Sequence, residues 1–133
     1  MEVKVISRAV GTANIIEWAR LALRDLHAPV LRVARLRHDH QGSPIAFENV
    51  VLVLGLFPDL ADDDDAIHDI AELARQYGRS LARSSERISI VPAGGEIAHH
   101  LGVAPGTDVL KLDRIVETSD GVPAEWRVAF SKA

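Results

Sequence analysis

Two pairs of extended segments with very short connections constrain the fold of this chain most strongly. Residues 30–37 and 44–54 flank the polar residues 38–43, and residues 109–117 and 122–130 flank Thr118-Ser119-Asp120-Gly121. Asp-Gly is among the strongest hairpin signals, and the polar connection is short enough for a second hairpin. Each pair is therefore predicted to form a β-hairpin.

Amphipathic segments and further extended segments complete the pattern. Asn14 is a typical helix N-cap residue, Gly78 is a typical C-terminal stop, and apolar residues recur at three- and four-residue spacing between such signals. The predicted helices are 15–26, 66–77 and 94–101, and the predicted additional strands are 3–10 and 81–91. The order strand, helix, hairpin, helix, strand, helix, hairpin favours an α+β fold, a largely antiparallel sheet flanked by helices.

Composition bounds the class of protein. The chain has 133 residues without a repeat or a linker, so we expect one domain, 1–133. The absence of cysteine excludes disulfides, cysteine zinc sites and a thiol nucleophile, and a formal charge of −4 argues against a dominant nucleic-acid-binding surface. No apolar run approaches the roughly 18 residues of a membrane span. With no signal-peptide pattern at the N-terminus, we expect a cytoplasmic protein that does not bind membranes.

A charged hairpin is the strongest candidate for chemistry. Arg35 and Arg37 lie two apart on a predicted strand, so both leave the same face and suit a carboxylate or a phosphate. If Arg37 lies opposite Pro44, then Arg35 opposes Ala46, and Glu48 lies diagonally across on the arginine face. A one-residue slip would bury Glu48 instead. In the favoured register the other face packs beneath a helix through Ala34, Leu36, Ile45, Phe47 and Val51.

Several motifs, taken in sequence order, carry a family resemblance. Residues 33–48 contain an RxR…GxPxxxE pattern, residues 96–114 are similar to ExAxxLxVxxGxxVLxLxR, and residues 121–125 match GxPxE. Together with Phe57-Pro58 and Tyr77-Gly78, they resemble the UTRA domain, the effector-binding half of HutC-subfamily GntR transcriptional regulators.

The resemblance implies a fold, a function and a set of site residues. It implies a chorismate-lyase-like antiparallel sheet that binds a small anionic metabolite and forms a homodimer. DNA is contacted in such regulators by an N-terminal winged helix-turn-helix domain, which is absent from this chain. The effector contacts that it implies are Arg35, Arg37, Glu48 and Glu125. His68 is added because phosphosugar-responsive members often have Ser at that position.

Three alternatives remain open at this point. The charged residues can form an exposed cross-strand ladder, in which each ion pair is worth at most about 1 kcal/mol. The chain can be an enzyme, because chorismate lyases share the expected fold and act on a small carboxylate, and fold alone does not assign a reaction. It can also be a dimerisation module that has lost its ligand.

The other polar clusters are interpreted structurally. His38-Asp39-His40 lies in a hairpin connection without a partner cluster, and the adjacent His99 and His100 cannot face one site on a helix. The run 62–65 lacks the spacing of a calcium loop and is predicted to cap the helix that follows. No nucleotide loop or nucleophile–base set is present. The sequence therefore predicts no catalytic residue, no cofactor and no metal.

Overall fold

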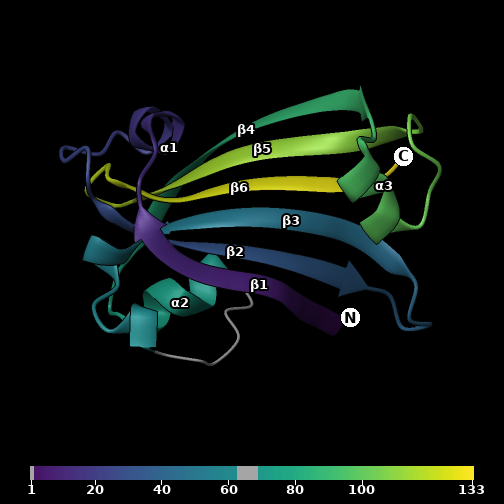
Figure 1. The fold of residues 1–133 in the computed structure, drawn as a ribbon. Helices are drawn as coiled ribbons and strands as arrows, with labels where there is room; N and C mark the ends of the chain where they lie inside the picture. The colour runs from purple at the N-terminus through teal and green to yellow at the C-terminus, as the bar shows by residue number, and fades with distance from the viewer. Residues whose placement is uncertain (1, 63–68) are drawn as a thin grey trace.

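One six-stranded antiparallel sheet forms the centre of the molecule, which a computed structural model describes over residues 2–62 and 69–133. Its strands lie in the order β1-β2-β3-β6-β5-β4 (Figure 1). They are β1 (Glu2–Thr12), β2 (Pro29–His38), β3 (Pro44–Val53), β4 (Leu81–Pro92), β5 (Asp108–Thr118) and β6 (Pro123–Lys132). The helical elements are α1 (Ile15–Arg20), the 3-10 turns η1 (Leu54–Leu56) and η2 (Leu60–Asp62), α2 (Ile70–Gln76) and α3 (Gly95–Leu101). The predicted antiparallel sheet with flanking helices is confirmed.

Both predicted hairpins form, and local turn chemistry explains them. In the β2–β3 connection the Asp39 carboxylate accepts hydrogen bonds from the backbone N–H groups of Gln41 and Ser43, at 2.8 and 2.9 Å. In the β5–β6 connection Gly121 has a φ of 79°, a left-handed conformation that glycine adopts without a steric penalty. The hairpins then pair through β3 and β6, which leaves β1 and β4 as the two edges.

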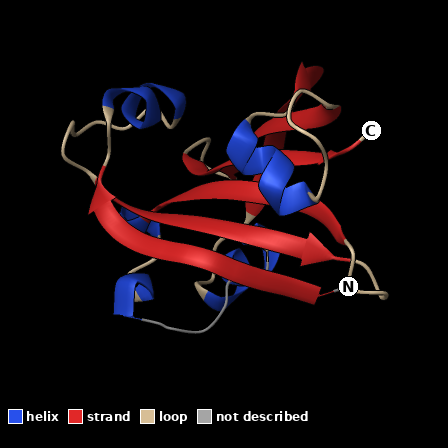
Figure 2. Cartoon of the chain, turned by 45° about the vertical axis from the view of Figure 1, so that its right-hand side comes forward, coloured by secondary structure: helices blue, strands red, loops and turns tan. Residues whose placement is uncertain are grey.

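The two faces of the sheet bury different clusters of side chains. On one face, which we call the α2 face, Leu31 and Leu52 pack with Leu73 of α2 and with Phe57. On the opposite face, the α1/α3 face, α3 covers one end and α1 the other (Figure 2). Leu36 and Phe47 pack beneath α3, as the sequence predicted. Because successive residues of a strand point to opposite faces, β2 and β3 contribute to both clusters.

Helix α1 is shorter than predicted. The pattern indicated a helix over 15–26, but α1 ends at Arg20, and Ala22 has a φ of 49°. A non-glycine residue in the left-handed region stops a right-handed helix. The turn places Leu21 and Leu23 in the cluster beneath α1, and this tertiary packing explains why the apolar spacing continues beyond the helix.

The cap of α2 also differs from the prediction. Asp69 is the N-cap, and its side chain accepts a hydrogen bond from the backbone N–H of Glu72 at 2.7 Å. Of the acidic run predicted to supply this cap, Asp62 lies in η2 and residues 63–65 lie outside the described residues. The described helix covers residues 70–76 of the predicted 66–77, because Asp69 offers the cap directly before an apolar stripe.

A buried carboxylate ties α1 to the sheet. Glu17 is 4% exposed and completes a capping box with Asn14, with backbone-to-side-chain distances of 2.8 and 2.9 Å. Arg32 of β2 donates to both Glu17 oxygens, at 2.8 and 2.7 Å. This hydrogen bonding outweighs burial and lowers the pKa of the Glu17 carboxyl.

We predict that Glu17→Ala lowers the free energy of unfolding by about 2 kcal/mol, because it removes both the cap and the charged hydrogen bonds from Arg32. Urea unfolding at neutral pH measures the change. Glu86→Ala, at an exposed position of β4, is the control and is expected to change stability by less than about 0.5 kcal/mol. Equal effects of the two substitutions would contradict the assignment.

Candidate functional site

Glu48 is the centre of a charged cluster on the α2 face. It lies directly opposite Arg35 in the β2–β3 pairing. Arg35 Nε donates to Glu48 Oε1 at 2.6 Å, and Arg37 Nε donates to the same oxygen at 3.0 Å. The structure therefore brings together three of the residues that the sequence singled out.

The register of this hairpin differs from the predicted one by two residues. Arg37 pairs with Ala46, where the sequence placed it opposite Pro44, and Glu48 is directly opposite Arg35, where a diagonal position was expected. An irregularity between Arg37 and His38 lets His38 take the place opposite Pro44. Because side chains alternate with a period of two, this offset leaves Glu48 on the predicted face.

Two arginines of the second hairpin extend the cluster. Arg127 of β6 places Nη1 3.5 Å from Glu48 Oε2. Arg114 of β5 donates through Nη2 to Glu125 Oε1 at 3.2 Å. Glu125 is one of the site residues predicted from the sequence, whereas neither arginine is. The alternation of the strand 122–130 carried a signal for one of them, because Arg127 shares a face with Glu125.

Most of this cluster is withdrawn from solvent. Arg35 and Glu125 are each 1% exposed, and Glu48 is 3% exposed. Burial by itself raises the pKa of Glu48, but the charge and hydrogen bond of Arg35 and the charges of Arg37 and Arg127 outweigh it, so the pKa lies below its usual value. Glu48 is therefore a buried carboxylate that stays ionised. The predicted alternative of an exposed charge ladder does not fit these exposures.

The cluster carries an excess of positive charge. Its described members are four guanidinium groups and two carboxylates, so the formal charges of +4 and −2 leave +2. The members are Arg35, Arg37, Arg114, Arg127, Glu48 and Glu125. A buried region with this balance favours anions. His68, the fifth predicted site residue, lies outside the described residues.

Two arginine side chains hold the connection between β3 and α2 near the α2 face through its backbone oxygens. Arg8 of β1 donates through Nη2 to the backbone oxygen of Leu60 at 2.6 Å. Arg79 donates through Nε to the backbone oxygen of Leu56 at 2.5 Å. The connection between β3 and α2 is thereby held at two points, by a residue of β1 and by a residue between α2 and β4. Buried Phe57 and Leu60 pack from this connection into the α2-face core.

The other histidines have structural surroundings. His100 stacks on Phe47, with ring centroids 4.5 Å apart and an interplanar angle of 9°, whereas His99 is exposed. Asp39 serves the β2–β3 turn. Within residues 2–62 and 69–133, no group of three or more His, Asp or Glu side chains is arranged to hold a metal ion. None of the helices in this part of the chain is long and apolar enough to cross a membrane.

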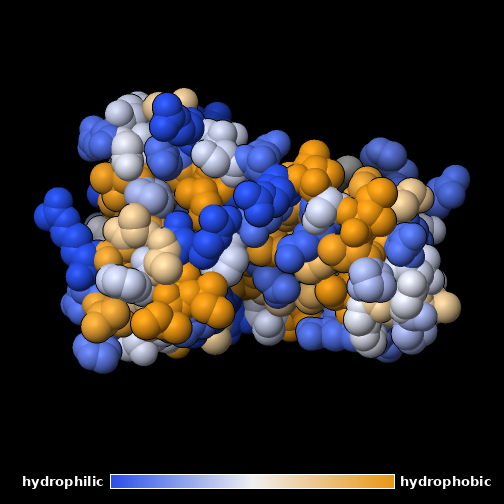
Figure 3. All heavy atoms as spheres, turned by 90° about the horizontal axis from the view of Figure 1, so that it is seen from above, coloured by the Kyte–Doolittle hydropathy of each residue, from blue (hydrophilic) through white to orange (hydrophobic). Residues whose placement is uncertain are grey.

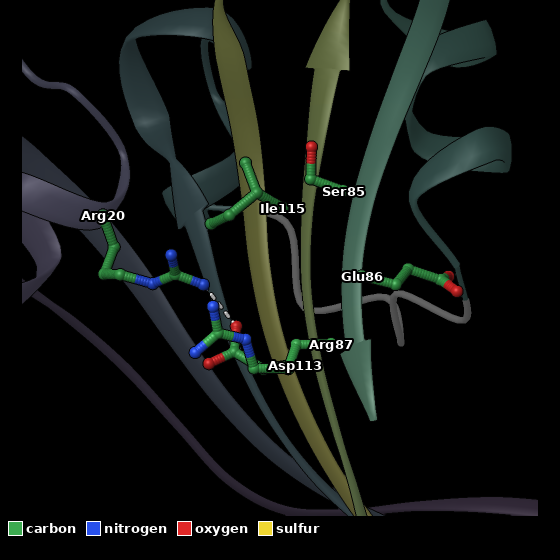
Figure 4. A pocket seen from close by; sticks show the side chains of 6 residues that line it. All are labelled: Arg20, Ser85, Glu86, Arg87, Asp113 and Ile115. Carbon is green, nitrogen blue, oxygen red and sulfur yellow. Dashed lines mark hydrogen bonds and ion pairs between the residues drawn. The ribbon is translucent and has the colours of Figure 1, made fainter. Parts of the chain in front are cut away.

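A surface cleft of about 420 Å³ lies on the opposite side of the sheet (Figure 4). Asp113 of β5 is its central acidic group. It forms an ion pair with Arg20 of α1 and accepts a hydrogen bond from Trp126 Nε1 at 2.9 Å. Arg87 of β4 also directs its guanidinium group toward Asp113. Asp113 and Arg114 are successive residues, so β5 presents one charged group to each face.

Comparisons with known proteins agree with this architecture. A model of the UTRA domain family matches residues 1–133. A GntR-family transcriptional regulator from Enterococcus faecalis superposes with a TM-score of 0.89 and 22% identity over 99% of this chain and 94% of that chain. PhnF from Mycobacterium smegmatis gives 0.89 and 22% over 98% of this chain. No curated protein sequence matches.

The lengths of these relatives differ. This chain covers 80% of the crystallised effector domain of PhnF, with a TM-score of 0.89 and 22% identity over 98% of its own length. It spans 57% of the longer PhnF chain. At these identities, the structural likeness establishes the shared fold.

We predict that Glu48→Gln destabilises the protein by about 3 kcal/mol at pH 7, because it leaves buried guanidinium groups without their carboxylate. The folded-state pKa of Glu48 is lowered, so its contribution to stability is present above the unfolded-state value, about 4.3, and is lost as the pH falls through the folded-state value. Urea unfolding between pH 7 and pH 3 should show the difference from wild type narrowing. A difference that is constant over this range would contradict the prediction.

Proposed function

Because this chain belongs to the UTRA domain family, we propose that it is the sensing domain of a GntR-type transcriptional regulator and binds a small anionic metabolite on its α2 face. The observation that carries the proposal is the buried charged cluster around Glu48, with its formal excess of +2 among the described residues. Buried ion pairs contribute little to stability compared with apolar residues of the same size. A ligand gives this costly arrangement a function.

The proposed ligand has an anionic end and a polar end. Arg35, Arg37 and the neighbouring arginines offer planar donors to a carboxylate or a phosphate. Glu48 and Glu125 are acceptors, and they suit hydroxyl, amine or imidazole groups of the same molecule. We retain His68 as a candidate contact on the strength of its position in the family motif. This function requires binding only, with no covalent step.

The regulator-level function is part of the same proposal. This chain spans 57% of PhnF, and we propose that a winged helix-turn-helix domain outside the present sequence contacts DNA. Ligand binding to the α2 face would then alter DNA affinity. The lyase alternative has less support, because the matching family and the superposed structures are regulator domains. Formation of 4-hydroxybenzoate from chorismate by the purified protein would revive it.

We predict that a thermal-shift screen of sugar phosphates, phosphonates, amino acids and urocanate-like acids identifies a ligand that raises the melting temperature by mass action. Calorimetric titration of that ligand should show Arg35→Ala weakening the affinity by at least about tenfold, because a charge-assisted contact is lost.

Matched variants protect this experiment from a folding artefact. Arg37→Ala, at a more exposed member of the pair, is expected to act in the same direction. Arg75→Ala, at an exposed position of α2, should bind like wild type. Circular dichroism identifies any variant that fails to fold. Unchanged affinity in folded Arg35→Ala and Arg37→Ala would remove the site assignment.

We further propose that a second copy of this chain covers the β4 edge. Ile88 and Ile90 are 67% and 65% exposed, and Leu110 beside them on β5 is 37% exposed. Figure 3 looks at the molecule from above the view of Figure 1 and shows apolar side chains at the surface. An exposed apolar edge strand has unpaired backbone groups and apolar side chains that can pair with a strand of another chain. A two-fold dimer is the commonest way in which a soluble chain meets this condition.

We predict that the double substitution Ile88→Lys and Ile90→Lys converts a dimer into a monomer, because it places charges in the proposed interface. Sedimentation velocity at several protein concentrations measures the state. Val10→Lys, at a 52% exposed position on the opposite edge strand β1, is the control and should leave the dimer intact. A wild-type chain that sediments as a monomer, or a double variant that stays dimeric, would refute the interface.

A further inference from the structure

Two arginines of the charged cluster lie side by side on neighbouring strands. Arg114 of β5 and Arg127 of β6 are direct cross-strand partners, so their side chains leave the same face of the sheet at neighbouring positions. Like charges in directly opposite positions destabilise an antiparallel pair. Both side chains are also largely buried, with 19% and 14% of their surface exposed.

The carboxylates that the structure describes nearby satisfy these two guanidinium groups only in part. Glu125 accepts one long hydrogen bond from Arg114, and Glu48 lies 3.5 Å from Arg127 while it accepts shorter bonds from Arg35 and Arg37. Among residues 2–62 and 69–133, the buried Nε atoms of Arg114 and Arg127 have no hydrogen-bond partner. A buried donor without an acceptor costs free energy, and more so when it carries charge. Burial also lowers the pKa of the Arg127 guanidinium. The charges of Arg114 and Arg35 lower it as well, whereas the charges of Glu48 and Glu125 raise it.

We propose that Arg127, together with Arg114, receives the anionic group of the ligand, a carboxylate or a phosphate, and that Arg127 thereby determines specificity for that group. This inference rests on the proposed function and refines it. Arg35 and Arg37 direct their Nε donors at Glu48 and position that carboxylate. In the part of the cluster that the structure describes, the buried Nε–H groups of Arg114 and Arg127 lack an acceptor.

An anion between these arginines would serve two purposes. It would supply acceptors to the unpartnered Nε–H groups, and it would screen one guanidinium from the other. The ligand-free protein therefore carries a local cost that the bound protein does not. Removing the Arg127 charge is therefore expected to raise the stability of the ligand-free protein and to lower its affinity for the anion.

The test compares wild type with Arg127→Met by thermal unfolding of the whole chain. The probes are inorganic phosphate and malonate, each raised to about tens of millimolar, with sodium chloride keeping the ionic strength constant. Wild type should gain about 4 °C when a probe reaches ten times its dissociation constant. Without a probe, Arg127→Met should melt about 2 to 4 °C above wild type, and the probe-dependent gain should disappear. Phosphate and malonate together distinguish a phosphate ligand from a carboxylate ligand.

Two further variants keep the result interpretable. Arg127→Lys keeps the charge but loses the planar fork, so it should melt like wild type without a probe and show about a tenfold weaker dependence on the probe. Arg87→Met replaces an exposed arginine of β4 that points to the opposite face (Figure 4) and should respond to the probes like wild type. If Arg127→Met melts several degrees lower, or retains the full probe-dependent gain, the inference is wrong.

Failure of the inference and failure of the proposed function give different results. If the metabolite found by screening binds wild type and Arg127→Met equally but does not bind Arg35→Ala, the sensing function stands and the role of Arg127 is refuted. If wild type responds to neither the probes nor any screened metabolite, both are refuted. A tenfold or greater loss of affinity in Arg127→Met, with normal folding, supports both.

Discussion

The ionised carboxylate of Glu48 is the interaction on which the charged face of this protein depends. It accepts hydrogen bonds from two arginines of the neighbouring strand and lies close to a third on the other hairpin. Without this charge, the guanidinium groups would repel one another inside a region with little water. Arg35 and Glu48 are also direct partners in the pairing of the first hairpin. The same side chain therefore joins two hairpins and permits an unusual density of positive charge between them.

One face of the sheet has an apolar half and a charged half. Towards α2, the face is apolar, and Leu31, Leu52 and Leu73 form its core. Further along β2 and β3, the same alternation presents Arg35 and Glu48 in place of leucine. The apolar half supplies the stability that holds the charged half in position, because apolar burial is the main favourable contribution to folding. The charged half is the region in which we propose that the ligand binds, and it contributes little to stability.

Local signals predicted most of the fold, whereas tertiary contacts determined what the sequence missed. Six strands, both hairpins and the Asn14 cap were readable, because alternation and turn residues act over a few positions. The register of the β2–β3 hairpin could not be predicted, because no sequence signal marks the irregularity beside His38. The end of α1 was also missed, because Ala22 adopts its left-handed conformation in a turn that buries Leu21. Arg127 escaped selection because the motif named its neighbour Glu125, and only the fold placed it beside Glu48.

Trp126 and Arg127 are successive residues of β6, and so are Asp113 and Arg114 of β5. Trp126 and Asp113 are hydrogen-bonded beneath α1, while both arginines face the other side. The two sides are therefore separated by a single layer of β-sheet. On each strand, two successive residues contribute one side chain to each side. If the proposed ligand shifted β6 on one side, Trp126 beneath α1 on the other side would move with it. The sheet thus couples its two faces mechanically, because a movement of β6 on the α2 face would also reach α1 on the α1/α3 face.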